Sequence, residues 1–283
     1  MGVRQLAAPA PALLVVAHGS RDPRHAATVA ALVARVRALR PDVRVTAGYL
    51  DFCAPSVPQA LSRLAADGGR KRDGVRGADG VREADDVREA DGVREVVALP
   101  LLLTRAFHAK TDIPAVLHAA AARLPGLAVR RAEVLGPSPL LTGGLERRLY
   151  EAGVRPEDRG STGVVLASAG SSDPEAGAVI AEIAREWRRT GWCAVRPAFA
   201  SARSPRTADA VRELRAEGVR RVAVAPYVIA PGRLPDRIAR GAREAGADVL
   251  AEVLGPCEEL ARLVALRYEE AVAASGVLPA LSA

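Results

Sequence analysis

The chain alternates between short apolar runs and longer amphipathic stretches, the pattern of alternating strands and helices. In the first half, apolar runs predict strands at residues 13–17, 43–50, 95–103 and 127–134. The amphipathic stretches predict helices at residues 24–39, 55–66, 112–124 and 139–152. The runs at 13–17 and 95–103 are apolar at nearly every position, as in parallel strands covered on both faces. We therefore predict an α/β fold with parallel sheets and helices on both faces.

The same order of elements recurs in the second half. Residues 164–174 read VVLASAGSSDP and match LLVVAHGSRDP at residues 13–23. The turn LGP near residue 135 recurs near residue 254, and residues 217–238 match residues 91–114 with a short gap. We therefore predict a tandem duplication of one domain, each copy with a parallel four-stranded sheet.

The predicted boundaries follow from composition. Residues 1–12 are rich in Pro and Ala and predict a flexible N-terminus. The N-terminal domain is expected at 13–152 and the C-terminal domain at 163–274. A low-complexity insert at 70–92 repeats with period six, as in DGVREA, which matches neither a helix nor a strand face. Its charged composition predicts a disordered or loosely helical loop.

Three ionisable residues follow predicted strands of the first half: His18, Asp51 and His108. In open α/β sheets, ligands bind just beyond the carboxyl ends of the strands. The second half has Ala169 in place of His18 and about Ser201 in place of Asp51, and His108 falls in the gap near Arg233. Groups needed only for folding would be expected in both copies. Their loss from the second copy indicates a functional site in the first.

Two imidazoles and a carboxylate suit a divalent metal such as Fe²⁺, Co²⁺, Ni²⁺ or Zn²⁺. The same groups could instead act as a general base and its orienting acid. The other histidines are weaker candidates. His25 starts the first long helix and is expected to face solvent or substrate, and His118 is expected on a helix surface.

Composition excludes several classes of protein. Aromatic residues make up only 3%, which argues against nucleic-acid stacking platforms, and no compact basic run is present. The net charge of +7 comes almost wholly from arginine and favours an anionic ligand. The sequence has no GxGxxG after the first strand, no P-loop and no GxSxG elbow.

Cysteine usage and hydropathy bear on the compartment. The three cysteines lie far apart without a CxxC pair, which argues against zinc ribbons and iron–sulfur clusters and suits a reducing cytoplasm. The longest apolar stretches are too short to span a bilayer, and the N-terminus lacks an adequate signal-peptide core. We therefore expect a soluble, cytoplasmic protein that binds neither membrane nor nucleic acid.

Three segments together resemble a known family. LLVVAHGSRDP, GYLDFCAP and LPLLLTRAFHAKTDIP are similar to the sirohydrochlorin chelatases, the type II tetrapyrrole chelatases of sirohaem and cobalamin synthesis. The resemblance covers about residues 13–273, and it is to the long, two-domain form of the family. It implies two chelatase-like domains facing a cleft and insertion of Fe²⁺ or Co²⁺ into sirohydrochlorin without ATP. It implies no permanently bound cofactor; the metal, with Ni²⁺ as a further candidate, is a substrate, and the partner is an anionic tetrapyrrole.

The resemblance also implies roles for individual residues. His18 and His108 correspond to the metal-handling histidines and would share metal binding and proton acceptance. Asp51 stands where relatives often carry Glu, and would orient a histidine or balance charge as the third catalytic group. The groups expected to bind substrate are Ser20, Arg21, Arg105 and Lys110. The sequence RAF before His108 and the repeat insert depart from the family pattern.

A non-catalytic metal or tetrapyrrole carrier is the alternative. A carrier would bind the same ligands without turnover. The sequence leaves open whether iron or cobalt is the physiological metal, how the two histidines divide their roles, and the oligomeric state.

Overall fold

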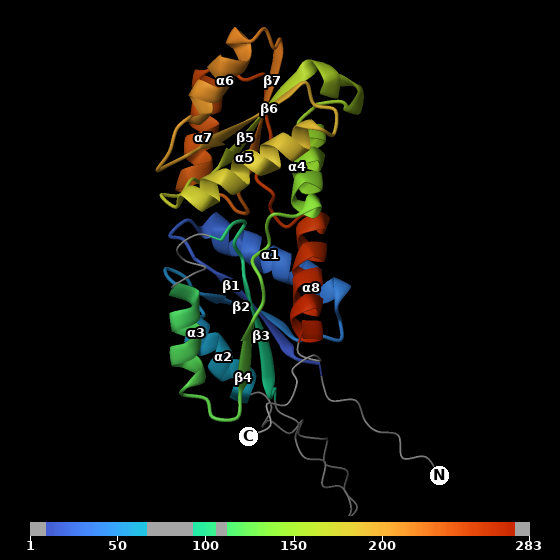
Figure 1. Cartoon of the computed structure of the whole chain (residues 1–283). Coiled ribbons are helices and arrows are strands. Elements are labelled where there is room, and N and C mark those ends of the chain that lie inside the picture. The colour runs from blue at the N-terminus through green and yellow to red at the C-terminus, as the bar shows by residue number, and fades with distance from the viewer. Residues whose placement is uncertain (1–9, 67–92, 106–111, 275–283) are drawn as a thin grey trace, which may run out of the picture.

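The computed structural model describes residues 10–66, 93–105 and 112–274. It contains two parallel four-stranded sheets, with strand orders β2-β1-β3-β4 and β6-β5-β7-β8. Each sheet lies in its own α/β lobe, and the two lobes are stacked along the long axis of the molecule (Figure 1). The predicted fold class is confirmed. Within the described residues, no helix combines the length and apolar character needed to cross a bilayer.

The first half follows the predicted order of elements, and its second, third and fourth strands are shorter than predicted. Its elements are β1 (Ala12–Ala17), α1 (Pro23–Leu39), β2 (Val45–Tyr49), α2 (Val57–Ala66), β3 (Glu95–Pro100), α3 (Ile113–Ala121), β4 (Ala128–Arg131) and α4 (Pro139–Glu151). β3 ends three residues before the predicted boundary at 103, because the chain turns after Pro100, where the Leu102 amide donates to the Pro100 carbonyl. The Leu101 amide still donates to the Val16 carbonyl of β1, and residues 102 and 103 then leave the sheet although they continue its apolar run.

The second half repeats this plan after a short 3₁₀ segment, η2 (Pro156–Ser161). Its elements are β5 (Thr162–Ser168), α5 (Pro174–Arg188), β6 (Ala194–Phe199), α6 (Thr207–Ala216), β7 (Arg221–Tyr227), α7 (Arg233–Glu244), β8 (Val249–Leu250) and α8 (Glu258–Ala273). In both halves the first strand is central and pairs in parallel with the second and third, β1 with β2 and β3, and β5 with β6 and β7.

The turn after the first strand has the same conformation in both halves. Gly19 (φ +93°) and Gly170 (φ +86°) adopt left-handed backbone conformations that favour glycine. A Cβ atom would lie 1.8 Å from the Asp51 carbonyl oxygen at Gly19 and 2.1 Å from the Ser201 carbonyl oxygen at Gly170. These matching contacts confirm the correspondence of Asp51 with Ser201 that the sequence comparison indicates.

The last helix of each half covers the sheet of the other half. α8, red in Figure 1, packs on α1 and β3, whereas α4 packs on β7 of the second sheet. On α8, the Arg267 guanidinium donates to the carbonyls of Val134 and Leu135, and the Tyr268 hydroxyl donates to the Pro11 carbonyl at 2.6 Å. Each sheet is therefore covered by the helices of its own half, except that the last helix comes from the other half.

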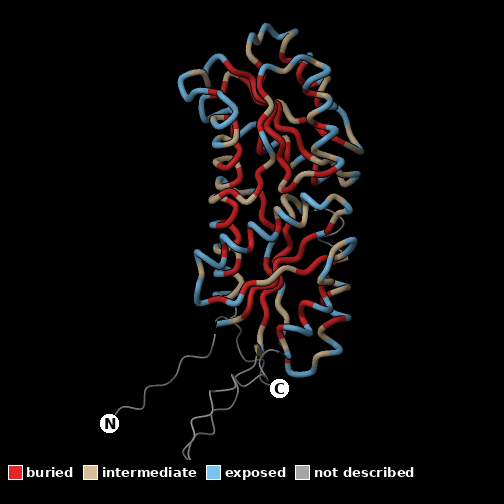
Figure 2. The backbone as a smooth tube through the Cα atoms, turned by 180° about the vertical axis from the view of Figure 1, so that it is seen from behind, coloured by how far each residue is buried: buried red, intermediate tan, exposed pale blue. Residues whose placement is uncertain are grey.

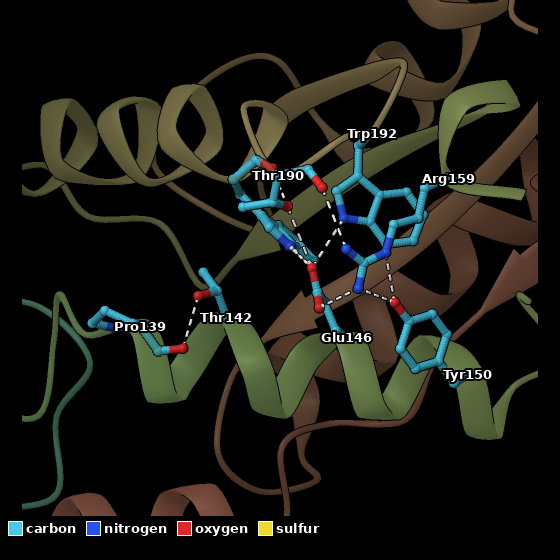
Figure 3. A network of polar contacts seen from close by, with 8 residues as sticks. Pro139, Thr142, Glu146, Tyr150, Arg159, Thr190 and Trp192 are labelled. Carbon is cyan, nitrogen blue, oxygen red and sulfur yellow. Dashed lines mark hydrogen bonds and ion pairs between the residues drawn. The ribbon is translucent and has the colours of Figure 1, made fainter. Parts of the chain in front are cut away.

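Glu146 fastens α4 to the second half through a cluster of donors (Figure 3). Its carboxylate accepts hydrogen bonds from the indoles of Trp187 at 2.9 Å and Trp192 at 3.2 Å, and from the Arg159 guanidinium at 2.8 Å. Arg159 also donates from Nε to the Tyr150 hydroxyl at 2.7 Å. The Glu146 side chain is only 18% exposed, so these charge-assisted bonds compensate for its burial.

The cores lie on both faces of each sheet, and the strands form the buried centre in Figure 2. The largest core is continuous between the halves and includes residues of α1, α4, α5 and α8. Separate cores lie under α2 and α3 in the first half and under α6 and α7 in the second. The shared core fixes the two sheets against each other and so fixes the space between their strand ends.

Candidate functional site

A cavity of about 720 Å³ lies between the two halves, at the carboxyl ends of β1, β3, β5 and β7. The first half contributes His18, Ser20, Arg21, His25 and Phe52, together with residues 101–104. The second half contributes the turn after β5 and the segment 227–235. The apolar residues that follow the end of β3 therefore line the cavity.

His18 stands in the cavity wall, directly after β1, and is exposed. Its backbone carbonyl accepts a hydrogen bond from the Asp51 amide at 2.9 Å, which continues the pairing of β1 with β2 into the loops. Its ring meets that of Phe52 edge to face, with centroids 6.5 Å apart and an interplanar angle of 78°. Phe52 is therefore an aromatic neighbour of the imidazole.

Asp51 is exposed and does not itself line the cavity. Its carboxylate accepts a hydrogen bond from the Phe52 amide at 2.8 Å, and its carbonyl accepts one from the Cys53 amide at 2.7 Å. These bonds support a tight turn in which Phe52 has φ +59°, a conformation that bulky residues rarely adopt. In this structure Asp51 shapes the turn that places Phe52 beside His18.

Phe52 is a cavity residue that sequence reasoning missed. It is 52% exposed, although it is a large apolar side chain. The Arg21 guanidinium lies over its ring, 5.1 Å from the centroid. The loop GYLDFCAP could have drawn attention to it, but the left-handed backbone that turns the ring toward His18 has no signal in the sequence.

The residues expected to bind substrate lie in different places. Ser20 and Arg21 line the cavity, and the Ser20 hydroxyl accepts a hydrogen bond from the Asp22 amide at 3.1 Å. Arg105 is exposed, forms an ion pair with Glu133 and does not line the cavity. His108 and Lys110 lie outside the described residues, as does the whole of the predicted insert, residues 70–92.

His25 lies in the first turn of α1 and lines the same cavity. Its ring is tilted against that of Tyr49, with centroids 6.5 Å apart, and within the described chain its Nδ1 atom is buried without a hydrogen-bond partner. Burial lowers the pKa of His25, the nearby His18 lowers it further, and Asp22 opposes the shift. His25 is therefore neutral at physiological pH. His118 is exposed on α3, as predicted.

The second half presents a different surface to the cavity. Ala169 lies where the first half has His18, and Val228 and Ile229 follow β7 in the same wall. Across the described ranges, no group of three or more His, Cys, Asp or Glu residues could hold a metal ion. The imidazoles at the described part of the site therefore come from the first half, and the second half contributes a mostly apolar wall.

An ion-pair bridge joins the two halves beside the cavity. Arg24 of α1 pairs with Asp22 at 2.6 Å and with Asp236 of α7 at 3.3 Å. The hydrogen bonds from Arg24 lower the pKa of Asp22, which also caps α1 by accepting from the Arg24 amide. Asp22 and Asp236 therefore both pair with Arg24. Their charges are balanced there and not by the other arginines of the cavity.

Two sirohydrochlorin chelatases match most of the chain. A sirohydrochlorin cobaltochelatase of Priestia megaterium is 25% identical over 232 residues, which cover 80% of this chain and 66% of the relative. A sirohydrochlorin ferrochelatase of the same organism is 24% identical over 271 residues, which cover 94% of this chain and 92% of the relative. The chain thus spans slightly less than two thirds of the first relative and nearly all of the second.

Solved structures show the same fold. SirB from Bacillus subtilis with Fe³⁺ superimposes with a TM-score of 0.75 at 23% identity, covering 94% of this chain and 98% of that one. CbiX, described as the terminal enzyme for biosynthesis of siroheme in denitrifying bacteria, gives a TM-score of 0.61 at 21% identity, covering 92% of this chain and 99% of that one. The family model of CbiX matches residues 12–71, 79–152 and 163–271. Both halves match, in line with the motifs around His18, and the chain therefore belongs to the CbiX family.

Proposed function

We propose that this protein inserts Fe²⁺ or Co²⁺ into sirohydrochlorin without ATP. The observation that carries the proposal is the placement of His18 at the carboxyl end of β1, in the wall of the cavity between the two halves. Family membership supports the same reaction, because the matching relatives are named sirohydrochlorin ferrochelatase and cobaltochelatase.

The cavity suits a flat, anionic macrocycle. Its volume of about 720 Å³ lies within the range of about 300–1,000 Å³ usual for small-molecule sites. Apolar residues 101–103 and the wall after β7 offer surfaces for the ring, and Arg21 supplies positive charge for peripheral carboxylates. We assign Ser20 and Arg21 of the cavity wall to substrate binding, together with Lys110 of the loop after β3. Arg105 is not included, because it pairs with Glu133 away from the cavity.

The reaction requires a base as well as a metal ligand. A free-base tetrapyrrole releases two pyrrole protons as the divalent metal enters, so a group near the ring must accept them. Neutral imidazole can hold the metal before transfer or accept a proton. We assign these tasks jointly to His18 and His108. Asp51 supports the site by holding the turn that places Phe52 against His18.

The domain roles follow from the same comparison. The N-terminal half, 13–152, carries the imidazoles, and the C-terminal half, 163–274, lacks a second set. The cytoplasm is the proposed compartment, because Cys53, Cys193 and Cys257 are all free thiols.

Metal insertion by the purified full chain tests the proposal. Sirohydrochlorin is incubated anaerobically with substoichiometric protein and Fe²⁺, Co²⁺ or Ni²⁺ in separate reactions, and absorbance follows the loss of free-base substrate. The proposal predicts many turnovers per chain with Fe²⁺ or Co²⁺, well above the rate without protein. Binding that stops at one equivalent per chain would instead identify a carrier.

A further inference from the structure

Two arginines reach the cavity and, among the described residues, have no carboxylate partner. Arg21 comes from the first half, and Arg233 comes from the start of α7 in the second. Both are exposed, and within the described parts of the chain neither forms an ion pair or a hydrogen bond to a carboxylate. Arg24, close by, shows the contrast, because it holds both Asp22 and Asp236. Asp22, which lines the cavity, is thus paired with Arg24, and the guanidinium groups of Arg21 and Arg233 remain available to a ligand.

The position of Arg233 is unfavourable for the helix that carries it. Arg233 is the first residue of α7 and follows Gly232 as N-cap. The amino end of a helix carries partial positive charge, so a cation there is repelled, and acidic residues are preferred. Helix stability therefore does not account for an arginine at this place, and a negatively charged ligand in the cavity would.

The internal duplication gives an independent argument. The first half places His18 and His25 in the cavity wall, and the second half has Ala169 and Ala176 at the equivalent positions. In the sequence comparison, His108 falls in a gap of the second half near Arg233 and Leu234. The second copy thus has small apolar groups in place of two imidazoles, and it carries a fixed positive charge near the gap that faces the third. This change removes metal chemistry and favours a flat apolar ring that carries carboxylates.

We infer that Arg233 is a substrate-binding residue of the second half, which together with Arg21 of the first half holds peripheral carboxylates of the tetrapyrrole. The ring then lies against the apolar wall at Ala169, Val228 and Ile229, with one face toward His18. The inference rests on the proposed function for the identity of the substrate. It changes the role of the second half from a support for the first to one wall of the substrate site.

The direct test measures binding without insertion. The dissociation constant of metal-free sirohydrochlorin is determined by absorbance titration for the wild type, Arg233→Gln and Arg240→Gln. Arg240 is the matched control, because it lies on the same helix, is exposed, and contacts Glu244 at 4.0 Å outside the cavity. Loss of a charge-assisted bond predicts roughly tenfold weaker binding for Arg233→Gln, and Arg240→Gln should bind like the wild type.

Further readouts separate substrate binding from a structural role. Arg233→Gln should raise KM about as much as the dissociation constant while leaving kcat nearly unchanged, because a carboxylate at the edge of the ring is held equally in the bound substrate and in the transition state. Arg233→Lys should recover part of the affinity, since it keeps the charge but loses the planar fork. Affinity should also depend less on salt in Arg233→Gln than in the wild type.

Failure of the inference and failure of the proposed function give different results. If Arg233→Gln and Arg240→Gln bind sirohydrochlorin equally well, the inference is overturned, whether or not the wild type inserts metal. If the wild type binds sirohydrochlorin through Arg233 but inserts no metal, the inference stands and the proposed chelatase activity falls. Equal KM values for the two variants in an active enzyme would also overturn the inference.

Discussion

At the scale of single residues, the site depends on how one turn places one aromatic ring. The carboxylate of Asp51 holds the amide of Phe52, and the ring of Phe52 meets both His18 and Arg21. The second half has Ala202 at the equivalent place with the same left-handed backbone, φ +61°. The turn therefore forms without the ring, and the ring belongs to the site.

Replacing Phe52 by Ala tests this assignment. The change should lower the rate of metal insertion several-fold, because His18 loses its edge-to-face neighbour and the cavity loses a wall. Stability should change little, since the ring is 52% exposed. Leu39→Ala is the control, because Leu39 is 43% exposed at the end of α1, away from the cavity. Equal insertion rates in both variants, with equal melting temperatures, would speak against a role for Phe52.

His25 predicts a pH dependence of stability. Its folded-state pKa is lowered, chiefly by burial, so the folded protein binds fewer protons than the unfolded chain below about pH 6.5. The stability that His25 supports is therefore present above that pH and is lost as the pH falls. The free energy of unfolding of the metal-free protein should drop less between about pH 7.5 and pH 5 in His25→Gln than in the wild type. Urea denaturation at both pH values measures this, and identical losses would refute the prediction.

Sequence reasoning finds the edge of the sheet where the site lies but only part of the site itself. The strand-end position of His18 and its replacement by Ala169 are both visible in the sequence. Phe52 and Arg233 are not, because a left-handed turn orients the first and the packing of two halves brings in the second. Arg105 follows a strand in the sequence, yet it lies outside the cavity and pairs with Glu133.

At the scale of elements, the alternation of apolar and amphipathic segments determines which helices and strands form. It does not determine where the last helix of each half packs. α4 and α8 are amphipathic whichever sheet they cover, so the exchange between the halves leaves no mark in the hydrophobic pattern. What settles it is a set of specific contacts, among them the cluster around Glu146 and the hydrogen bonds of Arg267.

Removing the Glu146 carboxylate should weaken the attachment of α4 to the second half. Glu146→Ala leaves the indole donors of Trp187 and Trp192 without their acceptor, which should cost about 1–3 kcal/mol of unfolding free energy. Glu151→Ala is the control on the same helix, because the Glu151 side chain is 50% exposed and should cost less than about 1 kcal/mol. Denaturation followed by tryptophan fluorescence gives both values. Equal losses in the two variants would show that the cluster adds no stability.

At the scale of the whole molecule, the duplication has produced two unequal copies joined by exchanged helices. The continuous core between the sheets holds their strand ends facing each other, and the cavity occupies the space that results. Imidazoles line it from one side and apolar groups with Arg233 from the other. Sequence comparison of the halves predicts this asymmetry, whereas the exchange of helices that fixes the walls emerges only in the folded chain.

The central claim is that His18 performs the chemistry of metal insertion. The measurement that tests it most directly is the rate of Co²⁺ insertion into sirohydrochlorin, corrected for spontaneous insertion, for His18→Ala and His118→Ala. Both histidines are exposed, so neither change should unfold the protein, and only His18 lines the cavity. The account predicts that His18→Ala falls close to the spontaneous rate while His118→Ala keeps most of the wild-type rate. Insertion by His18→Ala at the wild-type rate would contradict it.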